Sequence, residues 1–337
     1  MQWGGCERGR VSSAALKRAV RTSRAFEDAF QGHLGHRTVR IGHLVMERLA
    51  GLGLPEAALA SAASSVAKAF GKAEGTATET RQLSFFSDAE IAAAAALAER
   101  VARTGTEPTA KDLEDVLSPC TSAVDIALFG RMFADRGEIR MTAAAEVAHP
   151  FTVDRAALES DYYVAKDDHK PAEEDVGAGF IGEQFFVCGL FYGYARIDLG
   201  QLRRNLAGDW NLSVRAAKAF AEGVLKVSPS GKKASFGTNA HASWAMVERG
   251  AAAPRSLAAA FLKPVNGGDH LAEAISRAES LAEAMDTAYG EKWLRKSMDV
   301  AHHDPRTDPR WWPERTESGP RIGLTAASGG RHLVSPG

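Results

Sequence analysis

Apolar residues recur at helical spacing through the first third of the chain. In Ile41–Leu49 they lie three and four positions apart, a second such segment begins at Leu54-Pro55, and an alanine-rich run follows Ser87–Glu90. This spacing puts apolar side chains on one face of a helix, and a serine followed three residues later by glutamate is typical of a capping box. We predict that residues 26–120 are mostly helical, with one short strand over Gln82–Phe86.

The middle of the chain carries apolar runs with the length and residue types of strands. These runs are Val124–Phe129, Glu183–Tyr192 and Trp244–Glu248. Between the last two, Ser213–Val227 has the spacing of a helix, and Ser213 is a candidate N-cap. Strands and helices mixed with hairpins favour an α+β sheet over a doubly wound one.

The last seventy residues divide into two parts. Asp269–His302 has the periodicity of a second amphipathic helical region. Beyond Pro305 the prolines, glycines and arginines predict a loose tail.

Residues 149–182 are strongly acidic around a central strand. Eight carboxylates and three basic side chains lie in this stretch, about Tyr162–Val164 and a glycine-flanked return at Gly177–Gly182. We interpret it as a protruding β-hairpin. Because an acidic element repels phosphate, its expected partner is a base stack or a basic protein surface. A solvated hairpin without a partner is the alternative.

Composition is that of an ordinary globular protein. The chain has 337 residues, 45% of them hydrophobic, and a formal net charge of -1, which allows a sizeable core and one basic groove. No apolar run approaches the ~18 residues of a membrane span, and the N-terminus lacks the apolar segment of a signal peptide. We therefore expect a cytoplasmic protein with no membrane partner. Three widely spaced cysteines, Cys6, Cys120 and Cys188, indicate neither a disulfide framework nor a zinc site.

Basic charge is concentrated in the first 24 residues, where six arginines and lysines accompany one glutamate. Ser12 and Ser13 open a helical segment there, and either serine can cap it, while free helix amides suit a bound anion. Lys17, Arg21 and Arg24 recur at i, i+4 and i+7, which predicts one basic face. The pattern favours a reader of phosphate backbones, and a solvated amphipathic helix is the alternative.

Enzymatic motifs are weak throughout the sequence. His302-His303-Asp304 could be imagined as a metal site, but adjacent histidines diverge on a helix and the following tail offers no second shell. Gly231-Lys232-Lys233 lacks the upstream glycine and the hydroxyl residue of a Walker loop, so Lys232 and Lys233 are more plausibly a solvated loop with RNA contact possible. No serine or cysteine lies in a nucleophile elbow. We predict no catalytic residue, no metal ligand and no cofactor.

Several segments, in order, carry a resemblance to a known family. They are Gly4-Gly5 with Arg10–Ala19, Val124–Asp135 (with the run DIALFGRM), Ala143–His149, Tyr162–Asp168, Gly182–Ala195 and Ser256–Val265. In this combination the chain resembles the crRNA-binding backbone subunit of type I-E CRISPR Cascade, the CasC-type subunit. Two alternatives stay open, namely the backbone subunit of another CRISPR subtype and a free-standing single-strand RNA-binding module.

The resemblance implies a hand-shaped α+β protein with an RRM-like (ferredoxin-like) palm, inserted helical fingers and a β-hairpin thumb. It assigns residues 1–24, 121–148 and 183–268 to the palm, 25–120 to the fingers and 149–182 to the thumb. Residues 269–304 would follow as the C-terminal helical region and 305–337 as the tail. Several copies would stack head to tail, a heterologous interface that extends into a filament when its rotation does not close.

The resemblance also implies the partners and the site. The partners are crRNA, target DNA through the guide, further copies of the chain, and the large, small, CasD-type and CasE-type Cascade subunits. Met132, on the loop leaving the DIALFGRM strand, matches a side chain that wedges into the guide, with core packing as the alternative; Tyr163 and Val164 match the thumb tip. The full set expected to contact RNA is Arg10, Ser12, Ser13, Lys17, Arg18, Arg21, Arg131, Met132, Tyr163 and Val164.

One departure from the family pattern concerns the first strand. In the family a strand and a basic loop precede the Gly-Gly motif, whereas this sequence begins at Met1-Gln2-Trp3 directly before it. Loss of a central strand exposes unpaired ladder groups, so we expect an incomplete sheet and poor folding of the chain alone. Either the start codon is misassigned or the copy is defective. Ala14, where the family commonly has glutamine, and Cys6 and Glu7, where it has basic residues, predict a weaker phosphate grip.

Overall fold

The computed structural model describes residues 1–72, 78–133, 136–165, 180–231, 237, 239–300 and 321–333. It confirms a mixed α+β architecture with an antiparallel sheet and helices. The chain forms two compact units. The first unit contains residues 1–23, 147–196 and 220–337, and the second contains residues 24–146 and 197–219. Residues 121–146, assigned from sequence to the palm, cluster with the helices of residues 24–120.

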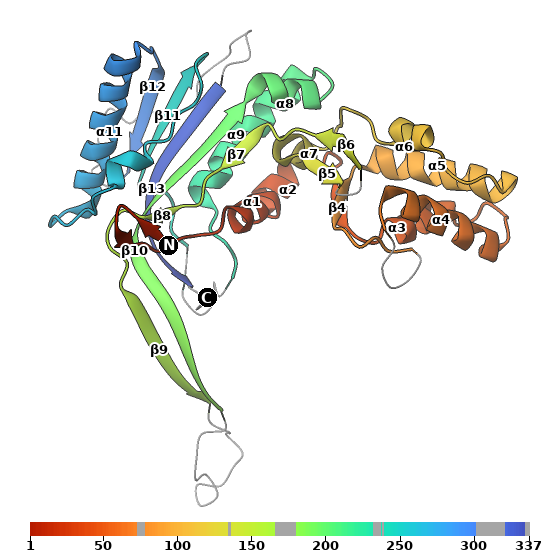
Figure 1. Cartoon of the computed structure of the whole chain (residues 1–337), viewed down its shortest axis with the longest axis horizontal. Helices are drawn as coiled ribbons and strands as arrows, with labels where there is room; N and C mark the ends of the chain where they lie inside the picture. Colours follow the sequence, from red (N-terminus) through yellow and green to blue (C-terminus); the bar gives the residue numbers. More distant parts are fainter. Residues whose placement is uncertain are drawn as a thin grey trace, which may run out of the picture. The chain divides into compact units, whose positions relative to one another are not determined.

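Most of the large sheet belongs to the first unit; its strand order is β12-β11-β13-β10-β7, with β8 and β9 also pairing with β10, and only the first two residues of β7 and the last two of β10 are counted with the second unit. Figure 1 shows β10 running from the β9–β10 hairpin into the sheet, with α11 alongside β12 and β11. The core of this unit joins aromatic sheet residues to the alanines Ala274, Ala278 and Ala282 of α11. The bounds are β7 (Ala145–Val147), β8 (Phe151–Thr152), β9 (Leu158–Ala165), β10 (Phe180–Asp198), β11 (Trp244–Gly250), α11 (His270–Tyr289), β12 (Leu294–Asp299) and β13 (Arg321–Leu333).

Strand β13 corrects two expectations. The predicted loose tail contains this strand, which pairs antiparallel with β11 from Trp244↔Ala327 to Gly250↔Arg321. It lies between β11 and β10 in the sheet. Among the described strands, β11 is paired with β13 on one side and with β12 on the other, so its ladder groups are satisfied on both sides. The expected gap in the sheet is absent from the described strands.

The predicted helical region at Asp269–His302 is half right. Asp269 caps α11 by accepting a hydrogen bond from the amide of Ala272, and Gly290, at φ 65°, ends the helix. The chain then forms strand β12 within the part of this region that was predicted to be helical. His302-His303-Asp304 lies outside the described residues, as do Lys232 and Lys233.

The first unit also contains the N-terminal elements. The hairpin of β1 (Gln2–Trp3) and β2 (Cys6–Glu7) turns at Gly4 and Gly5, which have φ values of 60° and 74°. A short 3-10 helix, η1 (Ala258–Phe261), lies beside it in the fold, since a Cβ on Gly4 would lie 1.7 Å from the carbonyl oxygen of Leu262. Glycine is therefore required at this turn both for its backbone conformation and for the close approach.

The second unit is mainly helical, as predicted. Its core gathers Ile41, Val45 and Leu49 of α3 with alanines of α4 and α5 and with Phe70, Phe86 and Phe133. Ser87 and Glu90 form the predicted capping box at the start of α5. The bounds are α2 (Arg24–Ala29), β3 (His36–Thr38), α3 (Ile41–Leu49), α4 (Glu56–Phe70), β4 (Ser84–Phe86), α5 (Asp88–Thr104), α6 (Ala110–Val116), α7 (Val124–Phe129), β5 (Arg131–Phe133), β6 (Arg136–Met141) and α8 (Leu199–Asn205).

The run Val124–Phe129 is a helix, α7, and the predicted strand is wrong. Five of its six residues are buried, Asp125 among them with its Oδ1 accepting the amide hydrogen of Gly35 at 2.8 Å. Apart from Asp125, this short segment is apolar on every side, and such a segment has no periodicity that distinguishes a buried helix from a buried strand. Gly130, at φ 75°, ends the helix and leads into β5.

The long helix α9 (Trp210–Lys226) begins earlier than predicted. The carboxylate of Asp209 accepts a hydrogen bond from the amide of Leu212 at 2.9 Å, and the hydroxyl of Ser213 donates back to the Asp209 carbonyl at 2.5 Å. Asp209 thus takes the capping role expected for Ser213, which lies inside the first turn. Residues 210–219 of α9 belong to the second unit and the rest to the first.

Candidate nucleic-acid interface

Helix α1 (Ser13–Arg21) begins with its first amides largely uncapped by side chains. Ser12 occupies the N-cap position with extended backbone, but its hydroxyl makes no capping hydrogen bond. The amide of Ser13 donates to Nδ1 of His149 at 2.9 Å. The expected serine cap is therefore absent. An oxygen ligand could take its place, because helix N-termini attract anions through free amides and the helix dipole.

The cations of α1 lie at its surface, while Val20 on the opposite side is 1% exposed. Arg10 and Arg18 are exposed and Lys17 and Arg21 are half-buried. Within the described part of the chain, Arg10, Lys17 and Arg18 have no carboxylate partner. The predicted basic face is shorter than expected, because α1 ends at Arg21. Arg24 instead opens α2 and pairs with Asp28 at 3.5 Å.

A buried arginine fixes the segment that leads into α1. Arg8 is 2% exposed and donates four hydrogen bonds to carbonyl oxygens, with Nη1 reaching Thr152, Val153 and Asp154 at 3.1, 2.6 and 3.0 Å and Nη2 reaching Phe261 at 2.8 Å. Burial lowers the pKa of Arg8 below its ordinary value. Arg8 is not among the site residues predicted from the sequence, and the signal that points to it is its position between Gly4-Gly5 and the serines.

The weakest of the six sequence segments, Ser256–Val265, has a structural role in this same region. The amide of Leu257 donates to the hydroxyl of Tyr192 at 2.8 Å, and the hydroxyls of Tyr192 and Ser256 are 3.1 Å apart. Burial raises the pKa of Tyr192 to about 12, so its hydroxyl stays neutral. These bonds hold the Ser256–Leu257 segment against β10.

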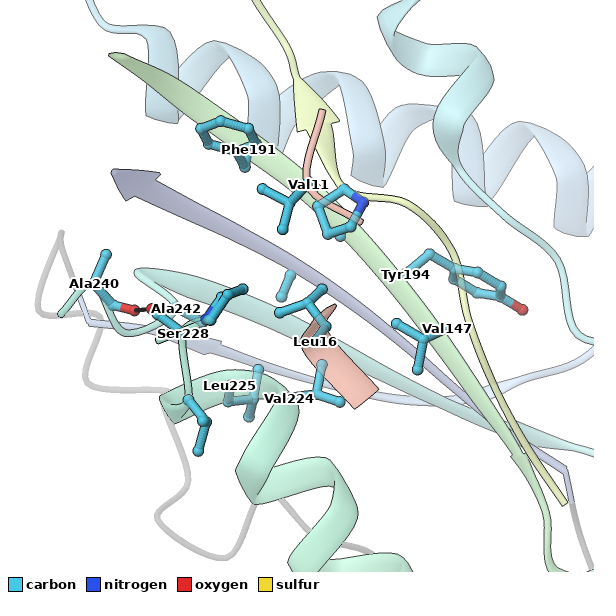
Figure 2. Close-up of a pocket in the computed structure, with 15 residues that line it drawn as sticks. Val11, Leu16, Val147, Phe191, Tyr194, Val224, Leu225, Ser228, Ala240 and Ala242 are labelled. Carbon is cyan, nitrogen blue, oxygen red and sulfur yellow. Dashed lines mark hydrogen bonds between the residues drawn. The ribbon is translucent and has the colours of Figure 1, made fainter. Parts of the chain in front are cut away.

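A small cavity of about 70 Å³ lies beneath the first turn of α1. Figure 2 shows Val11 and Leu16 entering it from the α1 segment, opposite Phe191 and Tyr194 of β10 and Val224 and Leu225 of α9. The lining is mainly apolar, so the pocket offers few polar partners to a charged ligand.

The hairpin of β9 and β10 has two chemically different faces. Directly paired residues share a face and side chains alternate along a strand, so Tyr162, Glu183 and Val164 lie on one side and Tyr163 and Gly182 on the other. The first face exposes Leu158, Tyr162 and Val164 to 59%, 64% and 55%, and we call it the apolar face, although it also carries the exposed carboxylate of Glu183, which accepts a hydrogen bond from the hydroxyl of Ser160. The second carries the exposed carboxylates Glu159 and Asp161. The hairpin prediction is confirmed for its described part; Asp167, Asp168, Glu173, Glu174 and Asp175 lie outside the described residues.

The two tyrosines of this hairpin differ in their contacts and in their exposure to solvent. Tyr163 lies against its cross-strand neighbour, since a Cβ on Gly182 would lie 2.5 Å from the Tyr163 ring and hydroxyl. Tyr162 is more exposed than Tyr163, 64% against 38%. The sequence predicts Tyr163 and Val164 as one tip contact, but they occupy opposite faces. Tyr162 shares the apolar face with Val164 and was missed, because adjacent strand residues cannot be assigned to faces before the register is known.

Met132 was expected on a loop that follows a strand. It lies instead on strand β5 of the second unit. Its side chain is 64% exposed, which excludes the core-packing alternative. Its carbonyl accepts a hydrogen bond from Nε2 of Gln82 at 3.0 Å, which holds the backbone at this position. The exposed thioether is thus free to contact a ligand.

Arg131, the residue before Met132, is placed differently from the prediction. It is 6% exposed, and its Nη1 lies 2.7 Å from both carboxylate oxygens of Glu90. A phosphate contact would require breaking this buried ion pair, so Arg131 holds β5 in place, which argues against its predicted RNA contact. The RNA contacts of the other nine residues stay predictions.

Neither a metal centre nor a membrane helix is found in the described ranges. No group of three or more His, Cys, Asp or Glu side chains there is arranged to hold a metal ion. In the same ranges no helix has both the length and the apolar character to cross a bilayer.

Comparison with known proteins places these features in context. The model of the family described as "CT1975-like protein" matches residues 1–310. A chain of a "CRISPR RNA-guided surveillance complex, pre-nicking" superposes with a TM-score of 0.76 at 28% identity, covering 94% of this chain and 89% of that one. A chain of a "CRISPR RNA-guided surveillance complex" gives 0.64 at 25% identity, with 94% and 88% covered. No curated protein matches the sequence.

Proposed function

The chain belongs to the CT1975-like protein family, and from that premise we propose that it is a non-catalytic backbone subunit of a type I-E Cascade complex. In this proposal it assembles head to tail along a crRNA and presents the bases for pairing with target DNA. The sheet of the first unit serves as the RRM-like palm, the β9–β10 hairpin as the thumb and the helices of the second unit as the fingers. The proposed location is the cytoplasm.

The proposal is carried by the basic helix α1, whose N-cap serine makes no capping hydrogen bond, taken together with the similarity of the chain to chains of two CRISPR complexes. The first turn of α1 has amides that no side chain caps beyond the one that donates to His149, and Lys17, Arg18 and Arg21 follow along the same helix, an arrangement that suits RNA phosphates. Such contacts do not depend on base sequence, which a guide-binding subunit requires because every spacer differs. Arg10, Ser12 and Ser13 extend the same surface toward the start of the helix.

Two exposed side chains fit the task of separating or covering bases. Met132 of the second unit and Tyr162 on the apolar face of the hairpin are both 64% exposed. An unbranched thioether and a flat ring contact base faces without reading base edges. The remaining partners proposed are the large, small, CasD-type and CasE-type subunits.

The experiment is co-expression of the full chain with a CRISPR RNA and type I-E Cascade subunits, followed by size-exclusion chromatography and extraction of bound RNA. A large particle that protects the guide is expected. A chain that folds and elutes without RNA would overturn the proposal. Assembly with the subunits of another subtype, but not with these, would keep the backbone role and reject the type I-E assignment.

A second experiment separates the backbone role from a free-standing RNA-binding module. The full chain is titrated with single-stranded RNAs of increasing length. Head-to-tail assembly predicts cooperative binding whose affinity per subunit rises with length. Saturation by one subunit on every short oligonucleotide would favour the simple module.

A further inference from the structure

Arg37 is held in a defined position on the surface of the second unit. It lies at the centre of β3, directly opposite Phe85 of β4. Its guanidinium carbon is 5.6 Å from the centroid of the Phe85 ring, which is a cation–π contact. The side chain is exposed to solvent. The ring therefore restricts a long side chain that would otherwise sample many rotamers.

The charge of Arg37 is not neutralised, in contrast to that of its neighbours. Nε of Arg40 pairs with Glu79 at 3.2 Å. Arg48 and His36 both contact the carboxylate of Asp88, at 3.0 and 3.2 Å. Among the described residues, Arg37 has neither a carboxylate partner nor a hydrogen-bond acceptor. Its N–H donors are therefore available to an external anion.

Arg37 and Met132 are connected through β4. The carbonyl of Phe85, the residue under Arg37, accepts a hydrogen bond from Nη1 of Arg131 at 3.3 Å. Gln82, two residues before β4, donates to the carbonyl of Met132 at 3.0 Å. The sheet of β3 and β4, which carries Arg37, is separate from the sheet of β5 and β6, which carries Met132, and these two hydrogen bonds link them.

We propose that Arg37 binds a backbone phosphate of the single-stranded nucleic acid that contacts Met132, either the guide or the target strand paired with it. The proposal rests on the proposed function and adds a contact in the second unit to those of α1. A planar guanidinium presents parallel N–H groups that match phosphate oxygens, and aromatic stacking orients it without consuming those donors. A single-strand backbone passing Met132 brings its phosphates within reach of a neighbouring cation.

The test compares Arg37→Gln with Arg40→Gln in the full chain. Both variants remove one exposed charge from neighbouring positions, but Arg40 is already paired with Glu79. RNA affinity is measured over a series of salt concentrations, and complementary DNA is then titrated onto the RNA-bound protein. We expect Arg37→Gln to weaken one of these steps about tenfold and to lower its salt slope by about 0.7 per contact, with Arg40→Gln unchanged. Arg37→Lys keeps the charge and should retain the slope.

The outcomes separate the two strands and the two proposals. A reduced slope in the RNA step assigns the contact to the guide, and a reduced slope in the DNA step assigns it to the target. Normal binding and slopes in both steps overturn the role of Arg37 while leaving the proposed function intact. Loss of cooperativity without a change of slope would mean that Arg37 contacts a neighbouring protein copy, which also overturns it. Failure of the unaltered chain to bind RNA refutes the proposed function instead.

Discussion

Nη1 of Arg131 lies 2.7 Å from both carboxylate oxygens of Glu90, with the two side chains 2% and 3% exposed. Glu90 is also the capping-box residue of α5 and accepts hydrogen bonds from the amide and hydroxyl of Ser87. One carboxylate therefore joins the start of a helix to the strand that carries Met132. This link makes the position of the exposed Met132 side chain depend on a buried ion pair.

Arg131→Met should destabilise the chain by about 3–5 kcal/mol, because it leaves the Glu90 carboxylate buried without its cation. Chemical denaturation monitored by circular dichroism measures the loss. Arg103→Met is the matched control, since Arg103 pairs with Glu99 on the same helix, also at 2.7 Å, but with side chains 52% and 34% exposed. An exposed pair contributes less than about 1 kcal/mol. Equal losses in the two variants would show that water reaches the Glu90 pair.

The charges of α1 should control RNA affinity without affecting its sequence preference. Lys17→Glu combined with Arg21→Glu is expected to weaken binding to all RNA sequences alike and to lower the salt slope by about 0.7 per lost contact. Filter binding over a salt series, with several unrelated RNAs, measures both quantities. Arg103→Glu serves as a control of equal charge change per site, on α5. Selective loss for one RNA sequence would instead indicate base readout.

Because Met132 is exposed, replacing it should affect RNA binding but not the stability of the fold. Met132→Ala should change the free energy of unfolding by less than about 0.5 kcal/mol, because surface substitutions usually stay within that range. It should still reduce RNA affinity. Met141→Ala on the neighbouring strand β6 is the control, since Met141 is 5% exposed. Removing a buried methionine costs about 2–5 kcal/mol. A large loss of stability in Met132→Ala would show that the Met132 side chain packs in the core.

The cavity beneath α1 offers a stabilising substitution (Figure 2). A Cβ on Gly193 would lie 3.8 Å from the carbonyl oxygen of Ala326 and 3.9 Å from Pro150, which are ordinary contacts. Gly193→Ala should therefore raise stability by about 0.5–1 kcal/mol, mainly by restricting the unfolded chain. Gly189→Ala on the same strand should destabilise, because its Cβ would lie 2.9 Å from Cγ2 of Thr152. Thermal melts of both variants test the contrast, and stabilisation by Gly189→Ala would contradict it.

Local signals in the sequence were sufficient for most helices of the second unit. The bounds of α3 match the predicted Ile41–Leu49, and the capping box at Ser87 fixes the start of α5. These elements depend on side chains within one or two turns, which a sequence displays directly. The α+β class followed because the predicted strands and helices are mixed with hairpins.

Features that depend on distant residues could not be predicted in the same way. Strand β13 contains Gly323, Ala326 and Ala327 and has weak strand character, and it forms because β11 supplies a ladder for it. Arg131 reads as a surface cation until the distant Glu90 is known to lie beside it. Arg24 was predicted to lie on the same helix face as Lys17 and Arg21, but the helix ends at Arg21. Thr22, the C-cap, is not a residue that signals a helix end in a sequence.

The adjacent tyrosines of the hairpin provide the sharpest pair of variants. Tyr162→Ala should leave the hairpin folded, because the side chain is 64% exposed, but should weaken RNA binding by about 1–3 kcal/mol if the ring stacks on a base. Tyr163→Ala should loosen the hairpin, because the ring covers Gly182 on the neighbouring strand and cross-strand pairs contribute about 0.2–1 kcal/mol. Hydrogen exchange of the β9 amides measures the second effect and RNA titration the first. Weaker binding from Tyr163→Ala with an intact hairpin, and none from Tyr162→Ala, would assign RNA contact to the acidic face and contradict the division between the two faces.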